Sequence, residues 1–260
     1  MNAESDKGII YMKNVWASYK SGQTVLQNIS MNIKPMSNYA IVGLSGSGKT
    51  TLLKIINGMM RASRGTVLVD HQTPDQRSPK FRGIMSRIGY IPQSLGLVRN
   101  SSVFDNVMMG ALSGMKTIPS LLKRYKPEDI VRAKEILEKV GLEGKEDRKA
   151  YMLSGGEKRR VAIARAFMHR PRILLADEII SELDGVTAHE IMDLVAGAQR
   201  ENGLTAVMIH HDIKMALEFA DRVALIQDGN KVMELGVDND KILDFQSGDA
   251  TNEEILNMYD

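Results

Sequence analysis

Apolar runs separated by turn residues make up the first 43 positions of this chain. The stretches 9–16, 25–33 and 38–43 are rich in β-forming residues, and Ser21-Gly22 and Lys34-Pro35 separate them. The centre of the third stretch is continuously apolar, which is typical of a strand that is buried on both faces of a parallel sheet. The pattern therefore predicts three strands near the N-terminus.

The apolar spacing then becomes helical and returns to short runs twice. It predicts a helix from Gly48 to about Met60, followed by strands over 65–70 and 87–92. Later in the chain it predicts strands over 173–176 and 205–209, with a helix over 188–199 between them. This alternation of strands and helices is typical of an α/β protein.

A mostly helical pattern interrupts this alternation between about Ser94 and Arg165. Its clearest helix begins near Pro127, since proline suits a first turn and the two acids that follow suit the positive end of the helix dipole. Apolar residues recur at helical spacing as far as Val140, and Gly141 is suited to end the helix. We therefore expect a helical insert within an α/β core.

Composition excludes several classes of protein. At 260 residues with 43% hydrophobic content, the chain suits one domain with an inserted subdomain, and no apolar segment approaches the roughly 20 residues that span a bilayer. The first seven residues are polar and lack the apolar core of a secretion signal. There is no cysteine for disulfides or thiolate metal sites, and a net charge of +2 is too small to indicate nucleic acid. These features favour a soluble, intracellular protein without a nucleic-acid partner.

The segment that follows the third predicted strand fits the phosphate-binding pattern G-x-x-x-x-G-K-[ST]. Its glycines let backbone N–H groups surround phosphate oxygens at a helix N-terminus. We expect Lys49 to reach the β- and γ-phosphates of a nucleotide and the Thr50 hydroxyl to bind Mg²⁺. The residues predicted to bind the nucleotide here are Gly43, Ser45, Gly46, Ser47, Gly48, Lys49 and Thr50.

Two adjacent acids end the apolar strand predicted over 173–176. They emerge at the carboxyl edge of the sheet, where α/β proteins place ligands. Asp177 suits the Mg²⁺ shell, while Glu178 suits polarising the water that attacks the γ-phosphorus in line. Because a phosphate-binding loop precedes this acid pair in the chain, we interpret the pair as catalytic and not as a solvated strand end.

A second anion-binding loop lies at 153–157, which reads Leu-Ser-Gly-Gly-Glu. Its hydroxyl and backbone N–H groups stand at a predicted helix start, which favours an anion. The residues 153–166 resemble the signature of the ATP-binding cassette (ABC) family and its following helix almost position for position. That resemblance implies a head-to-tail homodimer with two ATP molecules between its copies, in which Ser154, Gly155, Gly156 and Glu157 contact the partner's ATP.

The resemblance covers about 8–235 and implies further roles. His211 matches the switch histidine that contacts the γ-phosphate, although the adjacent His210 competes for this role. Gln93 matches the glutamine that touches Mg²⁺ and senses a transmembrane partner, and Thr51 is expected to contact the α-phosphate. Tyr19 matches the aromatic residue that stacks on adenine, the alternative being a place in the core.

Two departures from the family pattern stand out. The glutamine that usually follows the two signature glycines is Glu157 here, and the usual proline and threonine after Glu178 are Ile179-Ile180. Ser181 and Asp184 keep the inter-subunit loop recognisable. The missing proline puts the rigidity of this loop, and the tightness of coupling between the two ATP sites, in question.

The expected architecture is a P-loop NTPase of the ABC type, with an antiparallel β subdomain and an inserted α-helical subdomain. We expect a single domain in which 1–93 and 166–245 form the nucleotide-binding core with the β subdomain. Residues 94–165 would form the helical signature subdomain and 246–260 a short C-terminal tail.

Several stretches are similar to the ATPases of phosphonate importers, namely 56–58, 87–93, 103–107, 110–114, 120–122, 127–129 and 254–259. This resemblance implies transmembrane permease subunits as partners, a solute-binding protein as an indirect partner, and a location at the cytoplasmic face of the cell membrane. The alternatives are an importer of amino acids, a lipoprotein-release or export system, and a non-transport ATPase of the iron–sulfur assembly type.

Overall fold

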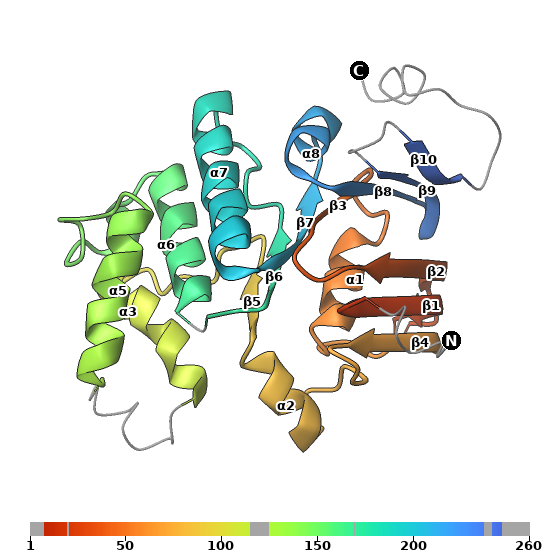
Figure 1. Ribbon diagram of the computed structural model, residues 1–260, viewed down its shortest axis with the longest axis horizontal. Coiled ribbons are helices and arrows are strands. Elements are labelled where there is room, and N and C mark those ends of the chain that lie inside the picture. The colour runs from red at the N-terminus through yellow and green to blue at the C-terminus, as the bar shows by residue number, and fades with distance from the viewer. Residues whose placement is uncertain (1–7, 20, 115–124, 169, 237–240, 246–260) are drawn as a thin grey trace. The chain divides into compact units, whose positions relative to one another are not determined.

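The computed structural model describes residues 8–19, 21–114, 125–168, 170–236 and 241–245 (Figure 1). These residues fall into two compact units. One unit runs to Arg82 and resumes at Thr205, and the other is Gly83–Leu204. Among the described residues no helix is long and apolar enough to cross a membrane.

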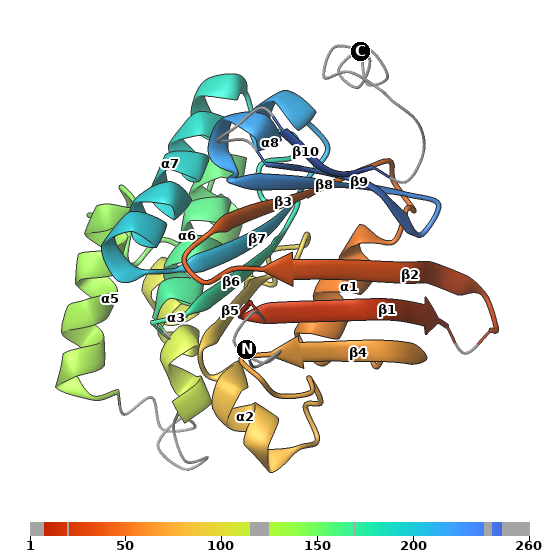
Figure 2. The same ribbon diagram turned by 45° about the vertical axis from the view of Figure 1, so that its right-hand side comes forward.

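An antiparallel sheet of three strands belongs to the first unit. Its strands are β1 (Ile10–Ser18), β2 (Thr24–Ile33) and β4 (Arg64–Val69), in the order β2-β1-β4. Figure 2 shows β1 lying between its two partners. The strands predicted over 9–16, 25–33 and 65–70 are confirmed within two residues.

A second group of strands in the first unit runs in the order β10-β9-β8-β3-β7. Strand β3 pairs in parallel with β7 on one side and with β8 on the other, while β8, β9 and β10 are antiparallel neighbours. Every residue of β3 and β7 is buried, as the apolar pattern predicts. The bounds are β3 Asn38–Val42, β7 Thr205–His210, β8 Arg222–Gln227, β9 Asn230–Gly236 and β10 Lys241–Phe245.

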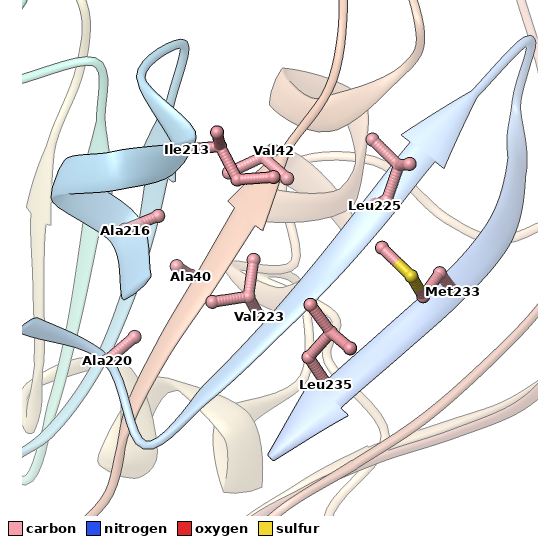
Figure 3. Packing of buried hydrophobic residues seen from close by; sticks show 9 residues of the cluster. All are labelled: Ala40, Val42, Ile213, Ala216, Ala220, Val223, Leu225, Met233 and Leu235. Atoms are coloured by element: carbon pink, nitrogen blue, oxygen red, sulfur yellow. The ribbon is translucent and has the colours of Figure 1, made fainter. Parts of the chain in front are cut away.

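Helix α8 (Ile213–Phe219) covers part of these strands and completes a hydrophobic cluster. Figure 3 shows Ile213 and Ala216 of α8 beside Val42 of β3 and Val223 of β8. Each of these side chains is nearly or fully withdrawn from water, which is the dominant favourable contribution to folding here. The cluster includes Val42 at the C-terminal end of β3, and the candidate phosphate loop follows that end.

Helix α1 (Lys49–Ile56) begins within the phosphate loop and is shorter than predicted. It ends in a Schellman motif, because Gly58 has a φ of 69° and the N–H groups of Gly58 and Met59 bond to the carbonyls of Ile55 and Lys54. The prediction that the helix reaches Met60 was therefore wrong. It followed from the apolar residues after Ile56, which continue the helical spacing beyond the true end of the helix. Helix α2 (Pro79–Met85) was not predicted.

The second unit combines two parallel strands with several helices. Strands β5 (Ile88–Ile91) and β6 (Ile173–Asp177) are paired, and all of β6 is buried. The helices are α3 Val103–Met108, α5 Pro127–Lys139, α6 Gly155–Phe167 and α7 Gly185–Asn202, with 3₁₀ turns η1 Met109–Gly114 and η2 Ala150–Met152.

Residues at the helix ends account for bounds of α5 and α7. Helix α5 has proline at its first position and acids in its first turn, and Gly141 with a φ of 69° follows its end, as predicted. Helix α7 begins three residues before the predicted start because Asp184 caps it, accepting a bond from the Thr187 N–H at 3.0 Å. Within the expected helical insert, 94–102 and 140–149 are turns and bends.

Two of the stretches that resemble phosphonate-importer ATPases, 120–122 and 254–259, lie outside the described residues, as does the predicted tail 246–260. The predicted division of the chain into a core and a helical signature subdomain stays a prediction.

Candidate functional site

The phosphate loop lies between β3 and α1 in the first unit, as its sequence predicts. Gly43 has a φ of 145°, and a Cβ there would lie 2.0 Å from the Ile226 carbonyl oxygen. Gly48 has a φ of 105°, and its Cβ would lie 2.6 Å from Leu26 Cδ2. Both positions therefore need glycine, for backbone conformation and for space. Between them, Leu44 to Gly46 are exposed, so this part of the loop is open to a ligand.

Lys49 is held inside the loop that precedes it. Its side chain is only 4% exposed, and Nζ donates to the carbonyl oxygens of Gly43 at 2.6 Å and Leu44 at 2.8 Å. The Ser47 hydroxyl is buried and has no hydrogen-bond partner among the described residues. An ammonium group and an unsatisfied hydroxyl in a glycine-rich loop suit the phosphates of a nucleotide.

Tyr19 belongs to the surface of the first unit. Its side chain is 44% exposed, so the alternative that it lies in the core is excluded. Its hydroxyl shares a hydrogen bond of 3.1 Å with Thr51 Oγ1, and Thr51 itself is buried in the first turn of α1. This bond places the exposed ring beside the phosphate loop, where a stacking partner for a base would lie.

The two candidate histidines have opposite surroundings. His210 is 1% exposed, neither ring nitrogen has a hydrogen-bond partner among the described residues, and burial lowers its pKa to about 4. His211, the next residue, is exposed. Because Val42 pairs with His210 in parallel register, His211 and Gly43 leave the same edge of the sheet. His211 is therefore the histidine that a ligand in the phosphate loop can reach.

In the second unit, the candidate acids lie at the end of β6, with Asp177 as its last residue and Glu178 directly after it. Asp177 is 2% exposed and Glu178 is half-buried, with a φ of 54° that is uncommon outside glycine. The parallel pairing of Ile91 with Ala176 brings the segment after β5 to the same edge. Gln93 Nε2 donates to Glu178 Oε2 at 2.7 Å, so the predicted Mg²⁺-contacting glutamine and the predicted catalytic carboxylate are in direct contact.

The predicted inter-subunit loop is stabilised from within its own chain. Ser181 Oγ donates to the Glu178 carbonyl at 2.9 Å, and Asp184 caps α7. The bond from the Thr187 N–H holds the pKa of the Asp184 carboxyl below its ordinary value. At the position of the missing proline, the Ile179 side chain is buried.

The signature forms the N-terminus of α6 through a capping box. Ser154 Oγ accepts from the Glu157 N–H at 3.2 Å, and Glu157 Oε2 accepts from the Ser154 N–H at 2.7 Å. The other carboxylate oxygen, Oε1, accepts from Lys145 Nζ at 2.6 Å. Lys145, and after it the Ser154 N–H, hold the pKa of Glu157 below its ordinary value. Glu157 therefore has a structural role within this chain, beside the contact with ATP that the resemblance implies.

Of the two signature glycines, Gly156 leaves room for helix α7. A Cβ on Gly156 would lie 2.8 Å from Thr187 Cγ2, whereas one on Gly155 would make only ordinary contacts, at 3.4 Å from Arg159 Nη1 and 3.9 Å from Leu183 Cδ2. Gly156 is thus required by packing between α6 and α7 as well as by the anion-binding loop that the sequence predicts.

Two arginines of α6 are functional candidates that the sequence analysis did not single out. The Arg159 guanidinium donates to the Ser181 carbonyl, which ties the signature helix to the predicted inter-subunit loop. Arg165 donates to the carbonyls of Leu95 at 2.5 Å and Gly96 at 2.6 Å, and so fixes the segment just after Gln93. The sequence held no signal that distinguished them, since the same helix also carries Lys158 and Arg160.

The residues present fit a Mg²⁺ ion that has few protein ligands. Among the described residues, no group of three or more histidine, cysteine, aspartate or glutamate side chains could hold a metal. Mg²⁺ usually keeps several waters and takes one or two carboxylates together with substrate phosphates. Among the candidate ligands named from the sequence, Asp177 supplies a carboxylate, Thr50 a hydroxyl oxygen and Gln93 an amide oxygen.

Comparison with known proteins places these features in a family. The family described as "ABC transporter" matches residues 26–181. The phosphonates import ATP-binding protein PhnC of Bdellovibrio bacteriovorus is 36% identical over 226 residues, which cover 86% of this chain and 87% of that protein. A protein of the same description from Haloarcula marismortui is 36% identical over 225 residues, covering 86% and 83%.

Solved structures agree with this match. A dimeric, post-hydrolysis state of an ATP-binding cassette bound to ADP and Pi has a TM-score of 0.77 and is 32% identical, covering 88% of this chain and 98% of that chain.

Proposed function

Because the chain belongs to the ABC transporter family, we propose that it is the ATP-hydrolysing subunit of an importer for phosphonate or a related phosphorus oxyanion. The predicted fold, an ABC-type P-loop ATPase with an antiparallel β sheet and helices, is confirmed, as is the predicted resemblance to phosphonate-importer ATPases. The chain is an ABC ATPase. The substrate of the importer is inferred from the names of relatives that match most of the length of this chain.

One contact supports the catalytic assignment most directly. The Gln93 amide donates to the Glu178 carboxylate at 2.7 Å, at the edge where β5 and β6 end. A carboxylate that polarises the attacking water must be held in a fixed orientation, and this bond orients Glu178. Glu178 is proposed as the catalytic carboxylate, with His211 as the residue that contacts the γ-phosphate.

The phosphate loop is proposed to bind ATP through the backbone N–H groups between Gly43 and Gly48, with Lys49 on the β- and γ-phosphates. Tyr19 would stack on adenine, and Thr51 would contact the α-phosphate. Mg²⁺, held by Thr50, Gln93 and Asp177, would neutralise charge on the phosphate oxygens. This chain's own residues bind the nucleotide, orient the water and position the Glu178 carboxylate.

The signature requires a second copy of the chain in this proposal. Ser154, Gly155 and Gly156 stand at the exposed start of α6, where helix dipole and N–H groups favour an anion. The dimeric state of the solved ATP-binding cassette supports a head-to-tail homodimer with ATP between the copies. Ser181 and Asp184 would lie at that interface, and 94–165 would act as the helical signature subdomain of a core formed by 1–93 and 166–245.

The import function implies membrane-bound partners. We propose that the chain docks on transmembrane permease subunits at the cytoplasmic face of the membrane and works indirectly with a solute-binding protein. Among the described residues no helix could cross a membrane, so attachment through a permease accounts for that location.

Reconstitution tests the proposal. The chain is co-purified with a candidate phosphonate permease and placed in proteoliposomes with the matching binding protein. We expect ATP-dependent uptake of radiolabelled methylphosphonate, and we expect Glu178→Gln to keep ATP binding while nearly abolishing both hydrolysis and uptake. Uptake of an amino acid instead of phosphonate would overturn the substrate. Full hydrolysis by Glu178→Gln would overturn the catalytic assignment. Failure of the chain to associate with any permease would overturn its proposed role in transport.

A further inference from the structure

A hollow of about 470 Å³ lies in the second unit, at the C-terminal end of α6, opposite to the end that carries the signature. It is formed by α5, by the last residue of α6, by the segment 170–172 that leads into β6, and by the end of α7. Figure 1 shows α5, α6 and α7 packed in succession. None of the residues assigned to ATP or to the signature lines this hollow.

Positive charge gathers at this hollow. Arg132, Lys139, Arg170 and Arg172 line it, against a single carboxylate, Glu135. Lys139 is paired with Glu201 at 3.0 Å, and the Arg132 guanidinium lies within electrostatic range of Arg170 and of the Glu135 and Asp129 carboxylates. Such a concentration of one charge is unfavourable by itself and attracts an anion.

Arg132 shows that this arrangement is incomplete. Its Nη2 donates to the Phe167 carbonyl at 2.9 Å, but its Nε is buried and has no hydrogen-bond partner among the described residues. Burial, and then the charge of Arg170, lower the pKa of Arg132. A buried donor of a charged group is costly to leave unsatisfied, so an acceptor is expected there.

Apolar side chains line the rest of the hollow. Ile136, Phe167 and Leu204 contribute to its wall, and a second hollow of about 570 Å³ adjoins it through Ile136, Lys139 and Phe167. A concave site of this size, with apolar walls and a few convergent polar groups, is typical of small-molecule binding.

We propose that this hollow binds a small organic anion that has a phosphonate or phosphate head and an apolar body. The head is received by Arg132 and Arg170, since guanidinium groups pair with such oxyanions through parallel hydrogen bonds. The apolar body lies against Ile136, Phe167 and Leu204. The anion is either a free organic molecule or the headgroup of an anionic lipid, because both present the same chemistry.

Isothermal titration calorimetry on the full chain tests this proposal. Saturating ADP is present, so that the phosphate loop is occupied, and phenylphosphonate is the probe because it combines the expected head with an apolar ring. We expect one binding event per chain. Arg170→Gln should weaken it about tenfold or more, the range for losing one charge-assisted hydrogen bond. Arg200→Gln removes the same charge from an exposed position on α7 outside the hollow, and should leave binding unchanged.

Two further titrations identify the source of the anion. Inorganic phosphate should bind more weakly than phenylphosphonate, because it lacks the apolar body. Phosphatidylcholine vesicles containing phosphatidic acid test the lipid headgroup. If the chain binds these vesicles, and if Arg170→Gln weakens the binding while Arg200→Gln does not, the lipid headgroup is supported as the source. Absence of binding by all three probes, or equal binding by wild type and Arg170→Gln, overturns the proposal. Binding is measured without hydrolysis, so the result is independent of the proposed transport function.

Discussion

The ion pair between Lys145 and Glu157 offers a direct test of how the signature helix is held. Lys145 Nζ lies 2.6 Å from Glu157 Oε1, and the two side chains are 35% and 21% exposed. Exposed pairs contribute about 0–1 kcal/mol and hydrogen bonds to charged groups about 1.5–3 kcal/mol. With one partner about a third exposed, solvent screening favours the lower end, and we expect about 1 kcal/mol.

Glu157→Gln removes the charge but keeps an oxygen that can accept from the Ser154 N–H. We therefore expect the loss of the ion pair alone, about 1 kcal/mol, or a fall in Tm of about 2–4 °C for a chain of this size. Glu157→Ala also removes half of the capping box and should cost about 1 kcal/mol more. Thermal unfolding followed by circular dichroism measures both values.

A double-mutant cycle with Lys145→Met isolates the pair. The pKa of Glu157 is lowered from its ordinary 4.5, so its contribution to stability is fully present above pH 4.5 and is lost as the pH falls through the lower pKa of the folded state. The coupling energy should therefore be constant from neutral pH down to about that value and then decline. A coupling energy of zero at neutral pH would refute the reasoning.

Two further predictions concern the start of α6. Ser154→Arg should leave ATP binding by the monomer largely intact while eliminating ATP-driven dimers and hydrolysis. The lost helix cap should lower the free energy of unfolding by about 1 kcal/mol. Loss of ATP binding by the monomer, measured by fluorescent-nucleotide titration, would mean that the loop is structural only. Gly156→Ala should lower the Tm because its Cβ would lie 2.8 Å from Thr187 Cγ2, and Thr187→Ser, which removes that methyl group, should restore part of the loss. Additive effects of these two substitutions would contradict the clash.

Features that depend on neighbouring residues were predicted well. The start of α5 at Pro127 and its end before Gly141 follow from backbone preferences of single residues, so they can be read directly from the chain. The same local reasoning overextended α1. Apolar spacing continued to Met60, but the hydrogen bonds of the Schellman motif around Gly58 end the helix at Ile56.

Burial added what the sequence could not show about its candidates. The family pattern favoured His211 over the adjacent His210, and the structure shows that His210 is buried with a lowered pKa while His211 is exposed. Tyr19 was compatible with the core or with the surface until its exposure was known. Exposure is a property of the packed chain, so no local pattern contains it.

By itself, the sequence determined the chemistry of this protein: a phosphate loop, an acid pair after a buried strand and a signature loop, in an order that indicates an ABC ATPase. These motifs are recognisable because each uses residues close together in the chain. Only the tertiary structure decided which groups touch. Gln93 and Glu178 are 85 positions apart, and Arg165 and Leu95 are 70 apart, yet each pair is hydrogen-bonded. Such contacts depend on how strands and helices pack, which is why they became visible only in the folded chain.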